Sequence, residues 1–222
     1  MNIYVISDIH GCNKTFKQAL KTIKLTKKDH LYLLGDLIDR GPDSKGVLDT
    51  VFLLKDSGFQ VTCLMGNHEL MFLESFTDIE KKIKWLKNGG KKTTESFLTT
   101  DSTLIPEKYI DFIKSFPFYI EKYDHILVHA GINMTIKKPF EDHNSMLWVR
   151  DWEKIYDKSW LKNRIIIHGH SPLKKQLISK QITSRVINID NGCFIKNDQD
   201  YGSLCVYNIT NGEFAFIKNL DQ

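Results

Sequence analysis

Residues 3–41 read IYVISDIHGCNKTFKQALKTIKLTKKDHLYLLGDLIDRG, and this stretch decides the fold class. The apolar runs Ile3–Ile6 and Leu31–Leu34 each have the length of a buried strand. Between them, apolar residues recur at helical spacing from Phe16 to Ile23, with Asn13 as the expected N-cap. The stretch therefore predicts a strand, a helix and a second strand.

The residues that follow repeat this order. Residues 43–57 carry an apolar face at helical spacing, Gly58 ends the helix, and Val61–Leu64 is a third run of strand length. Strands joined by helices in this way form a parallel sheet with right-handed crossovers. We therefore expect an α/β fold in which helices cover the sheet.

The remainder of the chain extends the same domain. Residues from about 70 to 116 are rich in lysine and mostly helical in pattern, with a turn at Asn88–Gly90, and we interpret them as a helical insertion. Strand-like runs follow at residues 126–129, 165–168, 185–189, 204–207 and 214–217. Short turns separate most of them, which favours a second, more antiparallel sheet. Because no repeat or low-complexity linker interrupts the chain, we expect residues 1–222 to form one domain.

The composition of the 222 residues is that of a globular protein. Hydrophobic residues at 41% and charged residues at 26% exclude a disordered chain and a disulfide-dense miniprotein. The formal net charge of +4 is too small to predict a nucleic-acid binder. The four cysteines are scattered without a CxxC pair and are expected to be buried free thiols. No secretory leader or membrane-spanning stretch is apparent, so we expect a cytoplasmic location.

Polar groups able to bind metals follow five of the predicted strands. They are Asp8 and His10 after the first, Asp36 and Asp39 after the second, Asn67 and His68 after the third, and His129 and His170 after two later ones. In open α/β sheets the carboxyl ends of the strands meet where ligands bind. Each residue has an ordinary alternative, since Asp8 can be a helix N-cap and Asp36 a turn former. Carboxylates, an amide and imidazoles at five strand ends together predict a divalent metal site.

These residues also carry a resemblance to a known family. The motifs are Asp8-x-His10, Gly35-Asp36-x-x-Asp39-Arg40-Gly41, Gly66-Asn67-His68-Glu69, His129-Ala130-Gly131 and Gly169-His170. In this order they resemble the calcineurin-like metallophosphoesterases, and most closely the small bacterial and bacteriophage serine/threonine protein phosphatases. The likeness includes residues 85–90, 148–150 and 189–192, so it spans nearly the whole chain. It implies a four-layer α/β fold of two mixed sheets packed as a sandwich and flanked by helices.

The resemblance implies a site for two divalent ions. Asp8, His10 and Asp36 would hold the first ion, and Asp36, Asn67, His129 and His170 would hold the second. The carboxylate of Asp36 would bridge the two, and a hydroxide shared by both ions would attack phosphorus. Mn²⁺ is the expected metal, with iron or zinc as alternatives.

The resemblance also implies roles for side chains that bind no metal. His68 would act as the catalytic acid, and Asp39 would orient it and favour its protonated form. The substrate phosphate would be bound by Arg40, Asn67 and Arg150. Arg150 has an alternative as the partner of Asp151 in a surface ion pair.

Three further features have open interpretations. His168 either supports a ligand from behind or fills the core. Asp190 either bonds a ligating imidazole or forms a turn with Asn191 and Gly192. The lysines of the insertion form a solvated face or attract acidic phosphorylated substrates.

Three functions are compatible with these features. The favoured one is hydrolysis of phosphoserine and phosphothreonine in proteins, with phosphotyrosine as a further candidate, or of small phosphoesters. The alternative is hydrolysis of dinucleoside polyphosphates such as diadenosine tetraphosphate, or of nucleotide caps on RNA, the one nucleic-acid partner expected. The symmetrical tetraphosphate hydrolases typically depart at the position of Asp39, which is intact here. An inactive binding module is disfavoured because every expected ligand and His68 are present, and no membrane partner is expected.

Overall fold

The first three strands form where the sequence predicts them. In the computed structural model, which describes residues 1–154 and 156–221, they are β1 (Ile3–Ile6), β2 (His30–Leu33) and β3 (Gln60–Cys63). They pair in parallel in the order β3-β2-β1. The helices α1 (Asn13–Thr22) and α2 (Ser44–Asp56) connect them. The predicted alternation of strands and helices is confirmed.

The second sheet differs from the expected one. It has the order β4-β5-β6-β7 and consists of β4 (Tyr119–Lys122), β5 (His125–Val128), β6 (Ile165–His168) and β7 (Val186–Asn188). Only β4, which the sequence did not predict, is antiparallel. The helices α7 (His143–Trp148), α8 (Lys158–Leu161) and α9 (Lys175–Ser179) return the chain between parallel strands.

The last two strands belong to the first sheet. The hairpin of β8 (Ser203–Asn208) and β9 (Glu213–Lys218) lies beside β1, with β8 antiparallel to it. The prediction of a second, more antiparallel sheet was therefore wrong. Short turns indicated hairpin geometry correctly, but β1 still had a free edge, and the hairpin pairs there.

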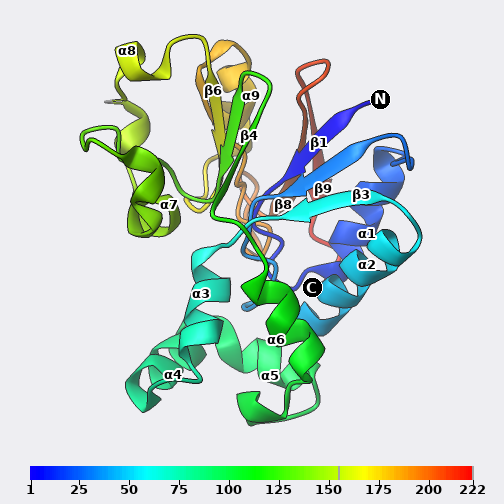
Figure 1. Ribbon diagram of the computed structural model, residues 1–222. Coiled ribbons are helices and arrows are strands. Elements are labelled where there is room, and N and C mark those ends of the chain that lie inside the picture. The colour runs from blue at the N-terminus through cyan, green and yellow to red at the C-terminus, as the bar shows by residue number, and fades with distance from the viewer. Residues whose placement is uncertain (155, 222) are drawn as a thin grey trace.

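The two sheets pack face to face. Side chains from both meet in one buried cluster, which includes Val5 and Leu34 from the first sheet and Leu127, Ile167 and Ile187 from the second. Each fully buried aliphatic side chain of this kind contributes about 1.5–3 kcal/mol to folding. Figure 1 shows α1 and α2 on the outer side of the first sheet and α7 and α8 on the outer side of the second. The expected α/β fold of two mixed sheets packed as a sandwich is confirmed.

The chain between β3 and β4 is helical and lies below both sheets in Figure 1. It contains α3 (Asn67–Glu74), α4 (Ile79–Trp85), η1 (Leu86–Gly90), α5 (Lys91–Ser96), η2 (Ser102–Leu104) and α6 (Glu107–Lys114). The expected turn at Asn88–Gly90 occurs within η1. Gly89 has a φ of 112°, which glycine adopts without steric cost, so α4 and α5 meet at a kink.

One predicted helix cap is wrong. Asn13 is the first residue of α1, and its side chain donates to Asp43 Oδ2 at 2.7 Å. The free N–H groups of Lys14 and Thr15 instead donate to the carboxylate of Asp221, each at 2.8 Å. A residue from the far end of the sequence therefore caps the first helix.

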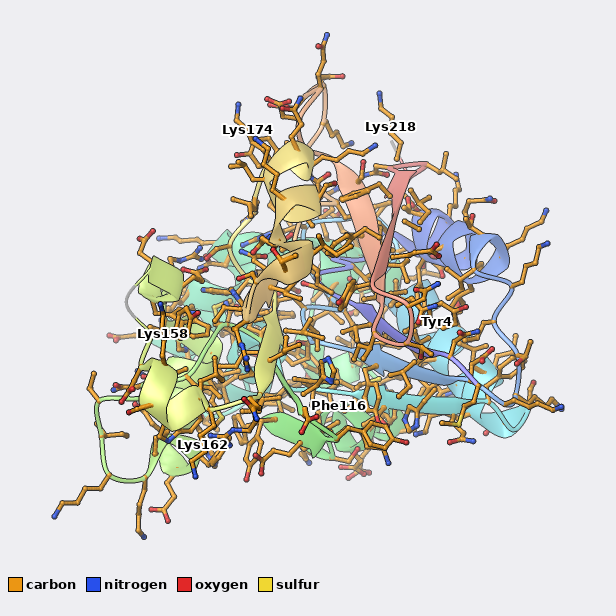
Figure 2. All side chains as sticks on the ribbon, turned by 90° about the horizontal axis from the view of Figure 1, so that it is seen from above. Tyr4, Phe116, Lys158, Lys162, Lys174 and Lys218 are labelled. Carbon is orange, nitrogen blue, oxygen red and sulfur yellow. The ribbon has the colours of Figure 1, made fainter. Side chains whose placement is uncertain are left out.

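The remaining helical elements are short turns, and several lysines lie on the surface. Short helical turns are η3 (Pro139–Glu141), η4 (Trp152–Lys154) and η5 (Lys180–Thr183). Figure 2 shows Lys174 and Lys218 extending outward at the periphery. All four cysteines are buried and free, as predicted. Within the described residues, no helix is both long enough and apolar enough to cross a bilayer.

Candidate active site

The predicted metal ligands gather where strands of both sheets end. Asp8 and His10 follow β1, Asp36 follows β2, Asn67 begins α3 after β3, His129 follows β5, and His170 follows β6. All six side chains are at least nine-tenths buried. Residues from both sheets reach one place because the two sheets present the carboxyl ends of their parallel strands to the same side.

One cluster consists of three ligand atoms that lie close together: Asn67 Oδ1, His129 Nε2 and His170 Nδ1. His129 Nε2 lies 2.9 Å from Asn67 Oδ1 and 3.1 Å from His170 Nδ1, and the last two atoms are 2.9 Å apart. The Nδ1 of His129 lies 3.0 Å from the carbonyl oxygen of Leu34 and donates to it, so its Nε2 carries a lone pair. Three contacts join these atoms, but at most one proton, on His170 Nδ1, lies between them. These contacts therefore cannot all be hydrogen bonds. A cation satisfies the three atoms together, so the donor set fits a divalent metal.

Asp36 joins this cluster to a second one. Its Oδ1 lies 3.5 Å from His129 Nε2, and its Oδ2 lies 3.5 Å from His10 Nε2. His10 repeats the arrangement of His129, because its Nδ1 faces the carbonyl oxygen of Ile38 at 3.0 Å and its Nε2 points inward. The two oxygens of one carboxylate thus face two separate imidazoles, as a bridging ligand requires.

Near His10, the structure places His68 within a group of possible metal ligands and leaves Asp8 outside it. The ligand atoms of His10, Asp36 and His68 lie within 4.8 Å of one another, whereas Asp8 is outside both such groups. The buried Asp8 carboxylate accepts the backbone N–H of His170 and bonds to the hydroxyl of Ser7. It therefore touches the second ligand set through the His170 backbone.

Backbone strain concentrates at these residues. Twelve non-glycine residues among those described have a positive φ, and half of them are predicted site residues. These are Asp8, His10, Asp36, Asp39, Arg40 and His170. The left-handed region is unfavourable for such residues and is retained where the surrounding structure imposes it. Gly169 shows the same crowding, since a Cβ there would lie 1.8 Å from Ser7 Oγ.

The local charges prepare the groups for cation binding. Burial alone would raise the pKa of Asp36, but His129, His68 and His10 around it hold that pKa below its usual value. Burial lowers the pKa of both His10 and His129, which favours neutral rings with a lone pair on Nε2. Burial and the neighbouring His129 lower the pKa of His170 to about 2. Ionised carboxylate and neutral imidazoles are the forms that bind metals.

His68 is held by Asp39 beside this centre. Its Nδ1 donates to Asp39 Oδ2 at 2.7 Å, and its Nε2 faces Asp36 Oδ2 at 4.0 Å. Burial would lower the pKa of His68, but Asp36 and Asp39 outweigh it and raise that pKa. The Nε2 of His68 thus points toward Asp36, one of the predicted metal ligands.

The two expected phosphate-binding arginines lie at the edge of the site. Arg40 Nη1 donates to His10 Nε2 at 2.9 Å, and its guanidinium lies over the ring of Phe194 at 4.3 Å. Arg150 is exposed and donates from Nη1 to Ser171 Oγ at 2.8 Å. Within the described residues it forms no ion pair with Asp151, which was its alternative role.

His168 and Asp190, whose roles the sequence left open, are both buried next to the site residues. His168 is buried, and its Nε2 has no hydrogen-bond partner among the described residues, the closest carboxylate being Glu153 at 3.5 Å. Burial lowers the pKa of His168 to about 3. Asp190 Oδ1 accepts the backbone N–H of Gly192 at 2.6 Å, which favours its turn role.

Sequence reasoning missed Glu69. Its Oε1 accepts N–H groups from Leu37 and Ile38, and its Oε2 accepts those of Asp36 and Gly66, at distances from 2.7 to 3.4 Å. This one side chain therefore fixes the loop that carries Asp36. A signal existed, since a glutamate at the third position of a helix reaches back to the N-cap backbone in a capping box.

Comparison with known proteins agrees with this geometry. The family model for calcineurin-like phosphoesterases matches residues 1–201. Serine/threonine-protein phosphatase 1 of Salmonella typhimurium is 30% identical over 193 residues, which cover 79% of this chain and 81% of that protein. A symmetrical bis(5'-nucleosyl)-tetraphosphatase of Vibrio parahaemolyticus is 32% identical over 134 residues, which cover 60% of this chain and 46% of that protein. The chain thus spans about half the length of the tetraphosphatase relatives it matches.

Solved structures share the fold. A cold-active protein-tyrosine phosphatase of a Shewanella species superposes with a TM-score of 0.67 and 18% identity, covering 98% of this chain and 80% of that one. At this identity the likeness concerns the fold alone. The match of the family model to most of the chain, over a site of converging metal-binding groups, gives the identity: the chain belongs to the calcineurin-like phosphoesterases.

Proposed function

We propose that this protein is a metal-dependent phosphomonoesterase that hydrolyses phosphoserine and phosphothreonine in proteins. The observation that carries the proposal is the buried 2.7 Å bond between His68 and Asp39. An alkoxide leaving from a phosphoserine ester is strongly basic and departs readily only if it receives a proton. A histidine held in its protonated form beside the metal ligands suits this requirement.

The metal ligands have the roles that the resemblance implies. His10 and Asp36, with Asp8, would hold one ion, and the cluster around Asn67, His129 and His170 would hold the other. Two bound ions, for which we propose Mn²⁺, would supply a nucleophile from water near neutral pH and stabilise negative charge on the phosphoryl oxygens. The fit rests on the converging lone pairs and the central Asp36.

The remaining residues act on the substrate. The guanidinium groups of Arg40 and Arg150 bind the non-bridging phosphoryl oxygens, and the charge that grows there strengthens these bonds. His68 gives its Nε2 proton to the leaving oxygen, which lies across the phosphorus from the attacking oxygen. Asp39 keeps the Nδ1 proton of His68 in a hydrogen bond, so the tautomer and the ring orientation stay fixed.

Hydrolysis of dinucleoside tetraphosphates is the second candidate, favoured by relatives such as the Vibrio enzyme. Cleavage between two phosphates releases a nucleoside phosphate, a weakly basic leaving group that needs little protonation. The pairing of His68 with Asp39 therefore supports the monoester more than the polyphosphate. The greater shared length with the Salmonella phosphatase supports the same choice.

The test compares these substrates on the Mn²⁺-loaded protein. We expect kcat/KM to be higher with a phosphoserine or phosphothreonine peptide than with diadenosine tetraphosphate. The variant His68→Asn should lose about 100-fold or more in kcat on the peptide and far less on p-nitrophenyl phosphate. Its metal content should match that of the wild type.

Two results would contradict parts of the proposal. A preference for diadenosine tetraphosphate would move the substrate to the nucleotide class and leave the ligand set unchanged. Equal losses for His68→Asn on the peptide and on p-nitrophenyl phosphate would remove the acid role from His68.

A further inference from the structure

Asp39 is bound by two side chains to which neither the sequence motifs nor the proposed chemistry assigns a role. The indole Nε1 of Trp85 donates to both carboxylate oxygens, at 3.1 Å to Oδ1 and 2.9 Å to Oδ2. The hydroxyl of Thr93 donates to Oδ1 at 2.6 Å. Both residues come from the helical stretch between β3 and β4, far along the chain from Asp39.

The protons around Asp39 can be assigned one by one. Oδ2 receives His68 and the indole, and Oδ1 receives Thr93 and the indole. The single hydroxyl proton of Thr93 goes to the carboxylate, so Ser44 Oγ, 2.9 Å away, donates to Thr93. The N–H of Asp39 is shared between the hydroxyl oxygens of Ser44 and Thr93, each at 3.0 Å. Each of the hydroxyl, indole and backbone protons named here thus has an acceptor.

Among residues 1–154 and 156–221, no other group forms a hydrogen bond with this carboxylate. Asp39 and Trp85 have no exposed surface, and Thr93 is about 1% exposed. A buried carboxylate without donors is costly, and one with fewer donors turns toward those that remain. The orientation of Asp39, and therefore of His68, depends on donors that the insertion supplies.

The backbone of the insertion is shaped for this approach. Gly89 accepts the N–H of Arg40 at 3.3 Å, and a Cβ on Gly89 would lie 2.8 Å from the Arg40 backbone nitrogen. A Cβ on Gly90 would lie 2.3 Å from the indole of Trp85. Two glycines in succession therefore let this segment lie directly against Asp39 and Arg40.

We infer that Trp85 and Thr93 are positioning residues for general-acid catalysis: they hold the Asp39 carboxylate in the one orientation that directs the His68 proton to the leaving group. This inference rests on the proposed phosphomonoesterase function. It assigns the insertion a part in the reaction beyond covering the core. Loss of either donor should harm the protonation of the leaving group and spare substrate binding.

The test uses two aryl phosphates that differ in their need for an acid. Phenyl phosphate has a more basic leaving group than p-nitrophenyl phosphate, and both are independent of the natural substrate. With Mn²⁺-loaded full-length protein, Thr93→Val should lower kcat on phenyl phosphate about tenfold and on p-nitrophenyl phosphate less than about twofold, with KM unchanged. Trp85→Phe, which keeps an aromatic ring without the N–H, should show the same split.

The chain supplies matched controls. Thr93→Ser keeps the hydroxyl and should restore kcat on phenyl phosphate. Thr94 is the next residue of the same helix and equally buried, but its hydroxyl donates to the carbonyl oxygen of Lys91. Thr94→Val should therefore change neither substrate. In a His68→Asn background, Thr93→Val should have no further effect, because the two residues act through one proton.

Each other outcome overturns a stated part. Equal losses on both aryl phosphates, or a further loss in the His68→Asn background, would show that Thr93 and Trp85 only support the fold. If Thr93→Val does not fold, Trp85→Phe decides by the same comparison. If the wild type hydrolyses neither aryl phosphate, the proposed function fails and this inference fails with it.

Discussion

At the scale of single residues, the site is built from side chains whose partners fix one protonation form. His10 and His129 each give their Nδ1 proton to a backbone carbonyl oxygen, so both Nε2 lone pairs face Asp36. The positive φ values of Asp36 and His170 aim these side chains inward at a conformational cost. Burial and charge then keep the carboxylate ionised and the imidazoles neutral.

Arg150 provides a prediction at this scale. Its exposed guanidinium beside His170 is expected to bind substrate phosphate, and a hydrogen bond to a charged group contributes about 1.5–3 kcal/mol. Arg150→Ala should raise KM by about tenfold or more and lower kcat by a smaller factor, because the bond strengthens as charge grows on the phosphoryl oxygens. Steady-state kinetics with p-nitrophenyl phosphate and inhibition by inorganic phosphate measure this.

Arg164→Ala is the matched control for Arg150. Arg164 pairs with Glu121 and with the carbonyl oxygen of Trp160 on the flank of the second sheet. Its loss should leave KM unchanged. A KM for Arg150→Ala equal to that of the wild type would assign Arg150 to the surface alone.

At the scale of elements, helix α1 depends on the far end of the chain. Asp221 accepts the N–H groups of Lys14 and Thr15 and the hydroxyl of Thr15, the last at 2.6 Å. Removal of a helix N-terminal acceptor costs about 1–2 kcal/mol. Asp221→Ala should therefore lower the free energy of unfolding by about that amount, as measured by urea denaturation with an unchanged m-value.

Asp221→Asn separates the contribution of the hydrogen bonds from that of the negative charge. The amide keeps one oxygen acceptor and loses the negative charge that the helix N-terminus favours, so its stability should lie between those of the wild type and Asp221→Ala. Wild-type stability in Asp221→Ala would mean that water replaces the carboxylate without loss.

At the scale of the whole molecule, the site joins the two sheets. His10, Asp36 and Asn67 follow strands of the first sheet, and His129 and His170 follow strands of the second. A cation held by both sets binds only the folded arrangement and stabilises it by mass action. At about a hundredfold excess over its Kd, Mn²⁺ should add about 2.7 kcal/mol, or raise Tm by roughly 5–10 °C.

The control is Asp36→Asn, which removes the carboxylate common to both ligand groups. Its Tm should be the same with Mn²⁺ and with EDTA, and its metal content after dialysis should fall to background. A Mn²⁺-dependent rise in Tm equal to that of the wild type would place the metal away from Asp36.

The sequence by itself determined the local elements and the chemical inventory of the site. Helical and strand periodicities depend on neighbouring residues, so β1, α1, β2, α2 and β3 were predictable within about one residue. The polar groups after those strands could be expected to converge because parallel strands present their carboxyl ends together. The capping position of Glu69 was also visible, although its four backbone partners were not.

The tertiary structure decided the pairings between distant segments. The hairpin β8-β9 joins β1, Asp221 caps α1, and Trp85 and Thr93 reach Asp39 across the insertion. No periodicity or spacing in the sequence predicts these contacts, because their partners are far apart in the chain. Each contact depends on which free strand edge or unpaired polar group lies nearby once the chain is packed. Burial then makes the choice, since a strand edge, a helix end or a carboxylate taken out of water must find a partner.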